Sequence, residues 1–204
     1  MSDLDETSEA TAEAPARKRP RPGERRLQIL QTLASMLEQP GAERVTTASL
    51  AGKIGVSEAA LYRHFASKAQ MFEGLIDFVD QSVVGLIRQV TDREAPGPNQ
   101  AARIVALLLQ FAEKNPGMCR VMTGDALVLE HERLQERINL LFDKIEAQLR
   151  QSLKVSDSNT PTADAQVAAS VLVAFMQGRL QRFVRSGFKR MPSEHLQAAL
   201  ARIL

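Results

Sequence analysis

Apolar residues in this chain recur at intervals of three and four positions over long segments. The clearest series is Leu134, Ile138, Leu141, Ile145, Leu149 and Leu153. This spacing places apolar side chains on one face of an α-helix. No segment alternates apolar and polar residues over a length that would support a strand. The sequence therefore predicts an all-α fold.

Proline, glycine and polar clusters divide the periodic segments into separate helices. Residues 1–23 are polar and aperiodic, and we expect a disordered arm there. The segment that begins at 99 must end before Pro116, because the residue before a proline is pushed out of the helical region. The predicted helices cover 24–38, 47–54, 58–65, 67–93, 99–114, 131–153 and 162–187, with a short terminal helix after Pro192. Gln39-Pro40-Gly41 is expected to stop the first helix, and the polar stretch 156–161 is expected to form a turn. The expected apolar face of the first helix runs through Leu27, Leu30, Ala34 and Leu37, with Ile29 and Leu33 beside them.

The stretch from Thr46 to Lys68 has the pattern of a helix-turn-helix. Thr46 or Thr47 can cap a first short helix, Gly55 allows a sharp change of direction, and Ser57 can cap a second helix. Two short helices joined through glycine are typical of this motif. Leu50, Ile54, Val56 and Leu61 can form the small core that fixes the angle between the helices.

The second helix of this motif carries side chains suited to DNA. We expect Ser57, Ala59, Tyr62, Arg63 and His64 to face outward. Small residues at its start let the backbone approach base edges, whereas Tyr62, His64 and Lys68 are placed for phosphate contacts. The alternative is structural: Tyr62 is then half-buried core, and His64 is an ordinary surface residue.

Charge is distributed unevenly along a chain whose formal net charge is only +2. Acidic residues occupy 1–14, and a basic run from Arg17 to Arg26, which includes Arg25, follows directly. A basic arm before a DNA-binding domain is expected to reach phosphates or the minor groove in a salt-dependent manner. A purely solubilising arm is the alternative.

Other classes of function find little support in the sequence. The single cysteine, Cys119, suits a reducing cytoplasm and is expected to be a small buried residue. The chain shows no signal peptide, no apolar run long enough to span a membrane and no spacing of metal ligands. Three scattered histidines and the lack of a phosphate-binding loop argue against catalysis. We expect a soluble cytoplasmic protein that is no enzyme and needs no cofactor or metal.

The run Leu61-Tyr62-Arg63-His64-Phe65-Ala66-Ser67-Lys68 resembles the signature of the TetR family. The resemblance implies major-groove recognition by residues 57–64, a phosphate anchor at Lys68 and a homodimer on palindromic double-stranded DNA. In that family the last two long helices of each chain, here 131–153 and 162–187, would build a four-helix bundle at the dimer interface. We predict DNA contacts from Arg25, Thr46, Thr47, Ser57, Ala59, Tyr62, Arg63, His64 and Lys68. The predicted domains are an arm (1–23), a DNA-binding domain (24–68) and a dimerisation and partner-binding domain (69–204).

Further motifs are similar to a TetR-like group of nucleoid occlusion factors. They include Asn115-Pro116-Gly117, residues 133–139, 145–151 and 182–189. The resemblance implies a DNA-activated antagonist of FtsZ, the division GTPase, associated with the nucleoid. The implied partner-binding residues are Phe78, Leu107, Lys114 and Asn115. Leu86 and Gln110 depart from the residue types of that surface, and Phe78 at helical spacing can instead be core.

A ligand-responsive repressor of the TetR type is the alternative function. Helix 99–114 offers mainly apolar side chains, so no small-molecule ligand is expected, although an apolar ligand stays compatible with it. A C-terminal cavity with convergent polar groups would favour the repressor. A basic cluster near the C-terminus is either a solvated face or a surface that attracts an acidic segment of a partner. It consists of Arg179, Arg182, Arg185, Lys189 and Arg190.

Overall fold

The computed structural model describes residues 23–39, 45–154 and 162–204, and all regular structure in these ranges is helical. This confirms the predicted fold class. The predicted arm apart from Gly23, the helix stop at Pro40-Gly41 and the turn at 156–161 lie outside the described residues. The elements are α1 (Glu24–Leu37), α2 (Thr47–Ile54), α3 (Glu58–Tyr62), α4 (Lys68–Thr91), α5 (Pro98–Lys114), α6 (Pro116–Met122), the 3₁₀ turn η1 (Asp125–Leu127), α7 (Glu132–Leu153), α8 (Thr162–Arg185) and α9 (Leu196–Ile203).

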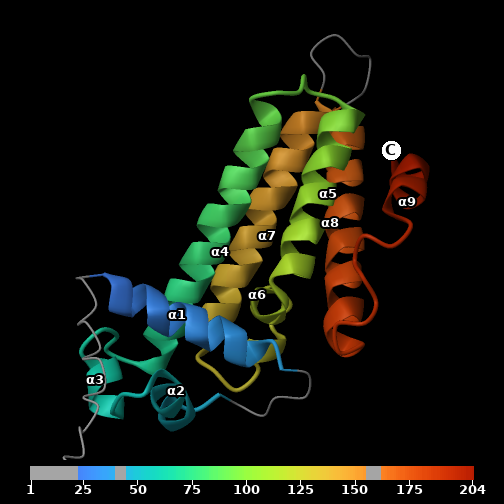
Figure 1. Ribbon diagram of the computed structural model, residues 1–204. Helices are drawn as coiled ribbons and strands as arrows, with labels where there is room; N and C mark the ends of the chain where they lie inside the picture. Colours follow the sequence, from blue (N-terminus) through green and yellow to red (C-terminus); the bar gives the residue numbers. More distant parts are fainter. Residues whose placement is uncertain (1–22, 40–44, 155–161) are drawn as a thin grey trace, which may run out of the picture.

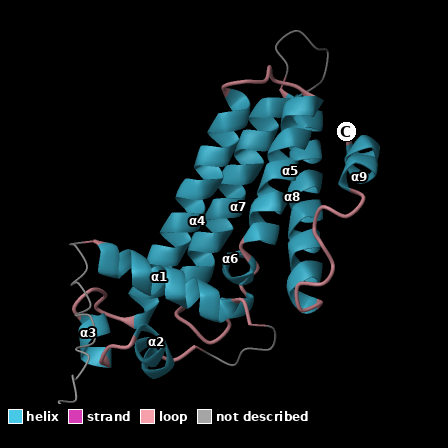
Figure 2. Cartoon of the chain, in the orientation of Figure 1, coloured by secondary structure: helices cyan, strands magenta, loops and turns pink. Residues whose placement is uncertain are grey.

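Four long helices form the body of the molecule. Helices α4, α5, α7 and α8 run side by side along its length, and α1 crosses one end of this bundle above α2 and α3 (Figure 1). Helix α9 lies beside α8 (Figure 1). Figure 2 shows that loops alone connect these helices in the described ranges. The two predicted long helices near the C-terminus are confirmed as α7 and α8, and the predicted terminal helix as α9.

Side-chain caps start three of the helices where the sequence predicts. The Thr46 hydroxyl accepts a hydrogen bond from the Ser49 amide, so Thr46 rather than Thr47 caps α2. Ser57 and Ser67 begin α3 and α4 in the same way. Each cap satisfies a backbone donor that has no partner inside the helix. These local signals fix where the elements of the motif begin.

Two predictions about local structure are wrong. Leu27 was expected on the apolar face of α1, but it is 48% exposed, and that face consists of Ile29, Leu33, Ala34 and Leu37. The recognition helix was expected to reach Phe65 but ends at Tyr62. It ends there because Phe65, only 1% exposed, turns into the core.

Helix α6, which the sequence analysis missed, joins the N-terminal helices to the body. Its Gly117 lies so close to α1 that an added Cβ would be 2.0 Å from the carbonyl oxygen of Ala34. Arg120 donates from Nη1 to the Leu37 carbonyl at 3.3 Å and pairs through Nε with Asp125 at 2.6 Å. The backbone of α1 is therefore held directly against α6.

Candidate nucleic-acid interface

The turn between α2 and α3 has the geometry that the helix-turn-helix requires. Gly55 adopts φ 76° and ψ 41°, a left-handed conformation that favours glycine. The amides of Gly55 and Val56 both donate to the Ala51 carbonyl, at 2.9 and 3.0 Å. Leu50, Ala51 and Leu61 are buried between the helices. This small core fixes the direction of α3.

A side-chain hydrogen bond ties the two helices of the motif together at their starts. Thr47 Oγ1 donates to Glu58 Oε2 at 2.6 Å. Thr47 was predicted to contact DNA, and the structure gives its hydroxyl a bond within the motif. The Thr46 hydroxyl is likewise engaged with Ser49 as the cap of α2. Both threonines thus position the motif, and their DNA contacts stay predictions.

The predicted recognition residues lie on the outward side of α3 and of the turns on either side of it. Ser57, Ala59, Tyr62, Arg63 and His64 are all exposed. Tyr62 is 45% exposed, which contradicts the alternative that it belongs to the core. Because α3 is so short, small side chains at its start and larger polar ones at its end share one compact surface. That surface can enter a major groove.

An arginine that sequence reasoning did not single out fixes the end of this surface. The guanidinium of Arg26 stacks over the Phe65 ring, 3.9 Å from its centroid. Its Nη1 donates to the carbonyl of His64 at 2.8 Å. Arg26 therefore holds the segment after α3 against α1. The neighbouring Arg25 is half-buried and donates to Gln28 at 2.7 Å.

Lys68, the expected phosphate anchor, is already engaged within the protein. Its ammonium lies 2.5 Å from Glu130 Oε1, and the two side chains are 19% and 7% exposed. The ion pair joins the first turn of α4 to the loop before α7. In this conformation the ammonium therefore faces the interior of the chain, and its phosphate contact stays a prediction.

The predicted partner-binding residues lie on α4 and α5, which pack against each other. Phe78 is 41% exposed, so the alternative that it is ordinary core is wrong. Leu107 is half-buried and Lys114 exposed. They are seven positions apart on α5, which places them on one face about 10 Å apart along its axis.

Asn115 differs from the other three predicted partner-binding residues. Its Nδ2 donates to the Phe111 carbonyl at 2.7 Å, and its side chain is half-buried. This residue caps the end of α5 and begins α6. Asn115 thus has a structural task at the junction of the two helices, whatever else it binds.

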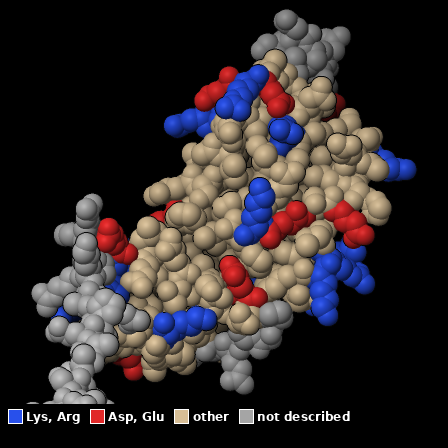
Figure 3. Space-filling view, in the orientation of Figure 1, with Lys and Arg blue, Asp and Glu red and all other residues tan. Residues whose placement is uncertain are grey.

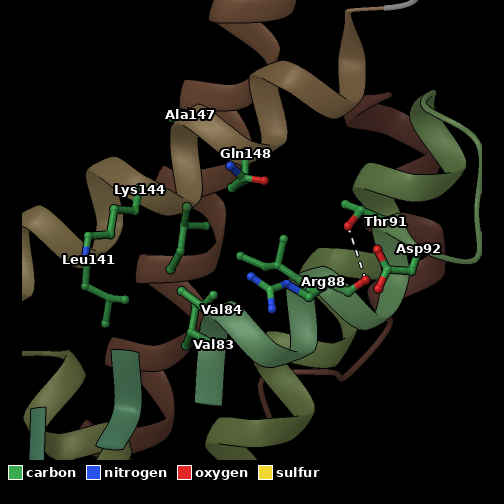
Figure 4. A pocket seen from close by; sticks show the side chains of 11 residues that line it. Val83, Val84, Arg88, Thr91, Asp92, Leu141, Lys144, Ala147 and Gln148 are labelled. Atoms are coloured by element: carbon green, nitrogen blue, oxygen red, sulfur yellow. Dashed lines mark hydrogen bonds between the residues drawn. The ribbon is translucent and has the colours of Figure 1, made fainter. Parts of the chain in front are cut away.

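Three ion pairs fasten α7 to α4. Glu73 accepts from Arg133 at 2.6 Å, Asp80 pairs with Lys144 at 2.8 Å, and Asp77 pairs with Arg137. Farther along the same seam is a hollow of about 430 Å³, lined by Val83, Val84, Ile87, Arg88, Thr91, Asp92, Leu141, Lys144, Ile145, Ala147 and Gln148. Figure 4 shows that both apolar and polar side chains line it, and the Thr91 hydroxyl donates to the Arg88 carbonyl.

One face of α8 presents apolar and small residues to solvent. Val167 is 62% exposed and Val171 45%, and the exposed Ala174 and Gly178 continue the same stripe. Spacings of three and four residues place them on one side of the helix. A helix with such a face can pack closely against a second helix.

Cys119 is fully buried, as predicted. Burial, reinforced by the negative charge of Asp125, raises the pKa of its thiol from 9.0 to about 12. The thiol is therefore neutral over the physiological range. Within residues 23–39, 45–154 and 162–204, no helix is long and apolar enough to cross a membrane. No group of three or more potential metal ligands occurs in that part of the chain either.

Two family descriptions match this chain. Residues 29–75 match "Bacterial regulatory proteins, tetR family", and residues 99–202 match the SlmA-like form of "Tetracyclin repressor-like, C-terminal domain". The nucleoid occlusion factor SlmA of Idiomarina loihiensis is 49% identical over 177 residues, which are 85% of this chain and 90% of that protein. SlmA of Vibrio cholerae is 50% identical over 173 residues, 83% of this chain and 88% of the relative.

Solved structures share the fold at much lower identity. A TetR-like transcriptional regulator from Rhodococcus superposes with a TM-score of 0.71 at 18% identity, covering 91% of this chain and 97% of that one. The fatty acid degradation regulator FadR from Bacillus halodurans gives a TM-score of 0.72 at 13% identity, over 89% and 95% of the two chains.

Proposed function

This chain belongs to the SlmA family of TetR-like DNA-binding proteins, and we propose that it is a nucleoid occlusion factor that antagonises FtsZ assembly when bound to DNA. The observation that carries the proposal is the sequence identity of 49–50% with SlmA proteins, over 84–85% of this chain. An alignment of that length includes both the DNA-binding and the C-terminal region. Identity confined to residues 29–75 would support only a DNA-binding regulator. Here it includes the C-terminal region, where a partner would bind.

DNA binding is assigned to the domain 24–68. We propose that Ser57 and Ala59 approach base edges and that Tyr62, Arg63 and His64 contact neighbouring bases and phosphates. Their shared exposure on α3 and the residues that flank it supports this assignment. Arg25, Thr46, Thr47 and Lys68 would complete the interface, Lys68 after exchanging Glu130 for a phosphate. The domain 69–204 then carries dimerisation and partner binding.

The dimer follows from the fold class together with the free face of α8. Members of this family are dimers, and two copies of α7 and α8 would pack as a four-helix bundle. The stripe from Val167 to Gly178 supplies the apolar and small side chains that such packing needs. A two-fold dimer is expected on a palindrome with half-sites about one helical turn apart.

We assign the FtsZ-binding surface to α4 and α5. The exposed ring of Phe78 supports this, because an aromatic side chain on the surface is a common anchor for a protein partner. Leu107 and Lys114 add an apolar and a cationic contact. Asn115 is assigned to the same surface, in addition to its hydrogen bond with Phe111. DNA must favour a dimer geometry that FtsZ also prefers, which is linkage between two binding sites.

The test is sedimentation of FtsZ polymers with GTP, with the protein added alone and with a duplex selected by the protein from random DNA. We expect a fall in pelleted polymer only when the duplex is present. Phe78→Asp should abolish this fall while duplex affinity is unchanged. Leu204→Asp, just after α9 and 39% exposed, is the matched control and should retain full activity. DNA binding with no effect on polymer would refute the assignment.

A ligand-responsive repressor remains the second candidate, because a specific feature favours it. The hollow between α4 and α7 has a volume of about 430 Å³, within the range of small-molecule sites. Its lining of both apolar and polar side chains would suit an amphipathic ligand. Release of the selected duplex by acyl compounds, blocked by Val83→Trp, would support this function. Retention of the duplex with every compound in the series would count against it.

A further inference from the structure

A basic surface at the end of α8 lies beyond the stripe from Val167 to Gly178 that the proposed function assigns to the dimer. The exposed cations are Arg182, Arg185, Lys189 and Arg190. None of them makes an ion pair or a side-chain hydrogen bond with another residue in the described ranges. Figure 3 shows Lys and Arg side chains gathered where α8 ends and the loop to α9 begins. We call the part of this surface that is lined by Arg182, Lys189 and Arg190 the basic hollow.

The surface is recessed. Arg182, Lys189 and Arg190 line a hollow of about 600 Å³ together with Met191, Ser193 and Glu194. Three cations thus face one carboxylate, and Met191 is 52% exposed among them. Another nearby acid, Glu113, is engaged with the Ser193 amide at 2.7 Å. The net charge inside the hollow is positive, and its surface includes an apolar side chain.

The loop that carries two of these cations is held in a defined shape. Gly187 and Phe188 both adopt left-handed conformations, with φ 62° and 63°. For phenylalanine this conformation is unfavourable, and surrounding contacts must maintain it. The Phe188 ring packs edge-on against Phe183 with centroids 5.2 Å apart. The amides of Lys189 and Arg190 both donate to Ser186 Oγ. The cations therefore extend from a preorganised turn.

We propose that the basic hollow binds an extended acidic peptide segment of a partner protein, with carboxylates on Arg182, Lys189 and Arg190 and an apolar side chain on Met191. Arginine and carboxylate form paired hydrogen bonds, which suits two of the three cations. Met191 among the cations favours a peptide over duplex DNA, since the phosphate backbone of a duplex offers no apolar group to this side chain. The surface lies on α8 and its following loop, whereas the proposed FtsZ contacts lie on α4 and α5.

The test is fluorescence anisotropy of a labelled twelve-residue peptide of glutamates interrupted by two leucines, titrated with the full-length dimer. We expect saturable binding that weakens at least fivefold between 50 and 300 mM salt. The Glu→Gln version of the peptide should not bind. Charge reversal by Arg182→Glu, Lys189→Glu and Arg190→Glu should weaken binding at least tenfold. The control reversal of three other exposed cations, Arg88→Glu, Arg103→Glu and Arg202→Glu, should weaken it less than threefold.

A milder variant guards against loss of folding. Lys189→Gln with Arg190→Gln leaves α8 intact, and light scattering checks that it stays dimeric. It should weaken peptide binding about threefold. Equal losses in the basic-hollow and control reversals would overturn the proposal. It would also fail if a non-operator duplex or phosphatidylglycerol vesicles displaced the peptide through the same residues at lower concentration, because the surface would then prefer phosphates. The assay contains no FtsZ, so it is independent of the proposed function.

Discussion

Replacing Gly117 by alanine tests how closely the DNA-binding helices are joined to the body. The new Cβ would lie 2.0 Å from the Ala34 carbonyl oxygen and 3.0 Å from its carbon. A carbon and a carbonyl oxygen rest about 3.3 Å apart, so α1 and α6 must separate by roughly 1.3 Å. Both contacting groups are backbone, and neither can move as a flexible side chain would. Arg120 would lose its 3.3 Å bond to Leu37 in the same movement.

The expected cost is about 3 kcal/mol, the upper part of the usual range for overpacking. For a chain of this size each kcal/mol changes Tm by roughly 2–4 °C, so Gly117→Ala should lower Tm by about 6–12 °C. Affinity for the selected duplex should also fall, since α1 frames α2 and α3. Thermal denaturation is measured at one fixed protomer concentration, because dimer stability depends on it.

Gly85→Ala is the matched control. Gly85 lies within α4, and nothing stands within 4 Å of its added Cβ. Alanine should stabilise this helix by about 1 kcal/mol, so the same substitution should raise Tm by roughly 2–4 °C. A Gly117→Ala protein with unchanged Tm and duplex affinity would refute the reasoning, because α1 and α6 would then not be in obligatory contact.

Three further predictions concern an ion pair, a cap and a thiol. Lys68→Met should lower the free energy of unfolding by about 2 kcal/mol in chemical denaturation, because it removes a charged hydrogen-bond donor from the buried Glu130 carboxylate. Lys68→Met combined with Glu130→Gln should lose less than the sum of the two single variants, and additive losses would contradict a coupled pair. Thr46→Ala should cost about 1 kcal/mol by removing the α2 cap, and an unchanged denaturation midpoint would count against that role. Folding raises the Cys119 pKa from 9.0 to about 12, so the unfolded chain loses this proton first as the pH rises. The free energy of unfolding should therefore decline between pH 9 and pH 12, and it should decline less in Cys119→Ala. Identical plots of unfolding free energy against pH for the two proteins would contradict this.

The sequence by itself determined most helices of this protein, though not α6, and it identified the helix-turn-helix motif. Thr46, Ser57, Ser67 and Gly55 act on backbone groups a few residues away, so their effect is readable without knowledge of the fold. Helical periodicity likewise identified α7 and α8. It could not decide which apolar side chains would be covered, because two adjacent faces of α1 were both apolar. The neighbours of α1 buried Ile29 and left Leu27 exposed.

Only the tertiary structure decided the surroundings of the functional residues. Phe78 has the spacing of a core residue, yet it is 41% exposed. Lys68 has the position of a phosphate anchor, yet its ammonium meets Glu130, 62 positions away in sequence. Such long-range contacts depend on how helices pack, and local patterns carry no information about them. For this reason the sequence identified the residue types of the site, and the packing determined which of them are exposed and which are already paired.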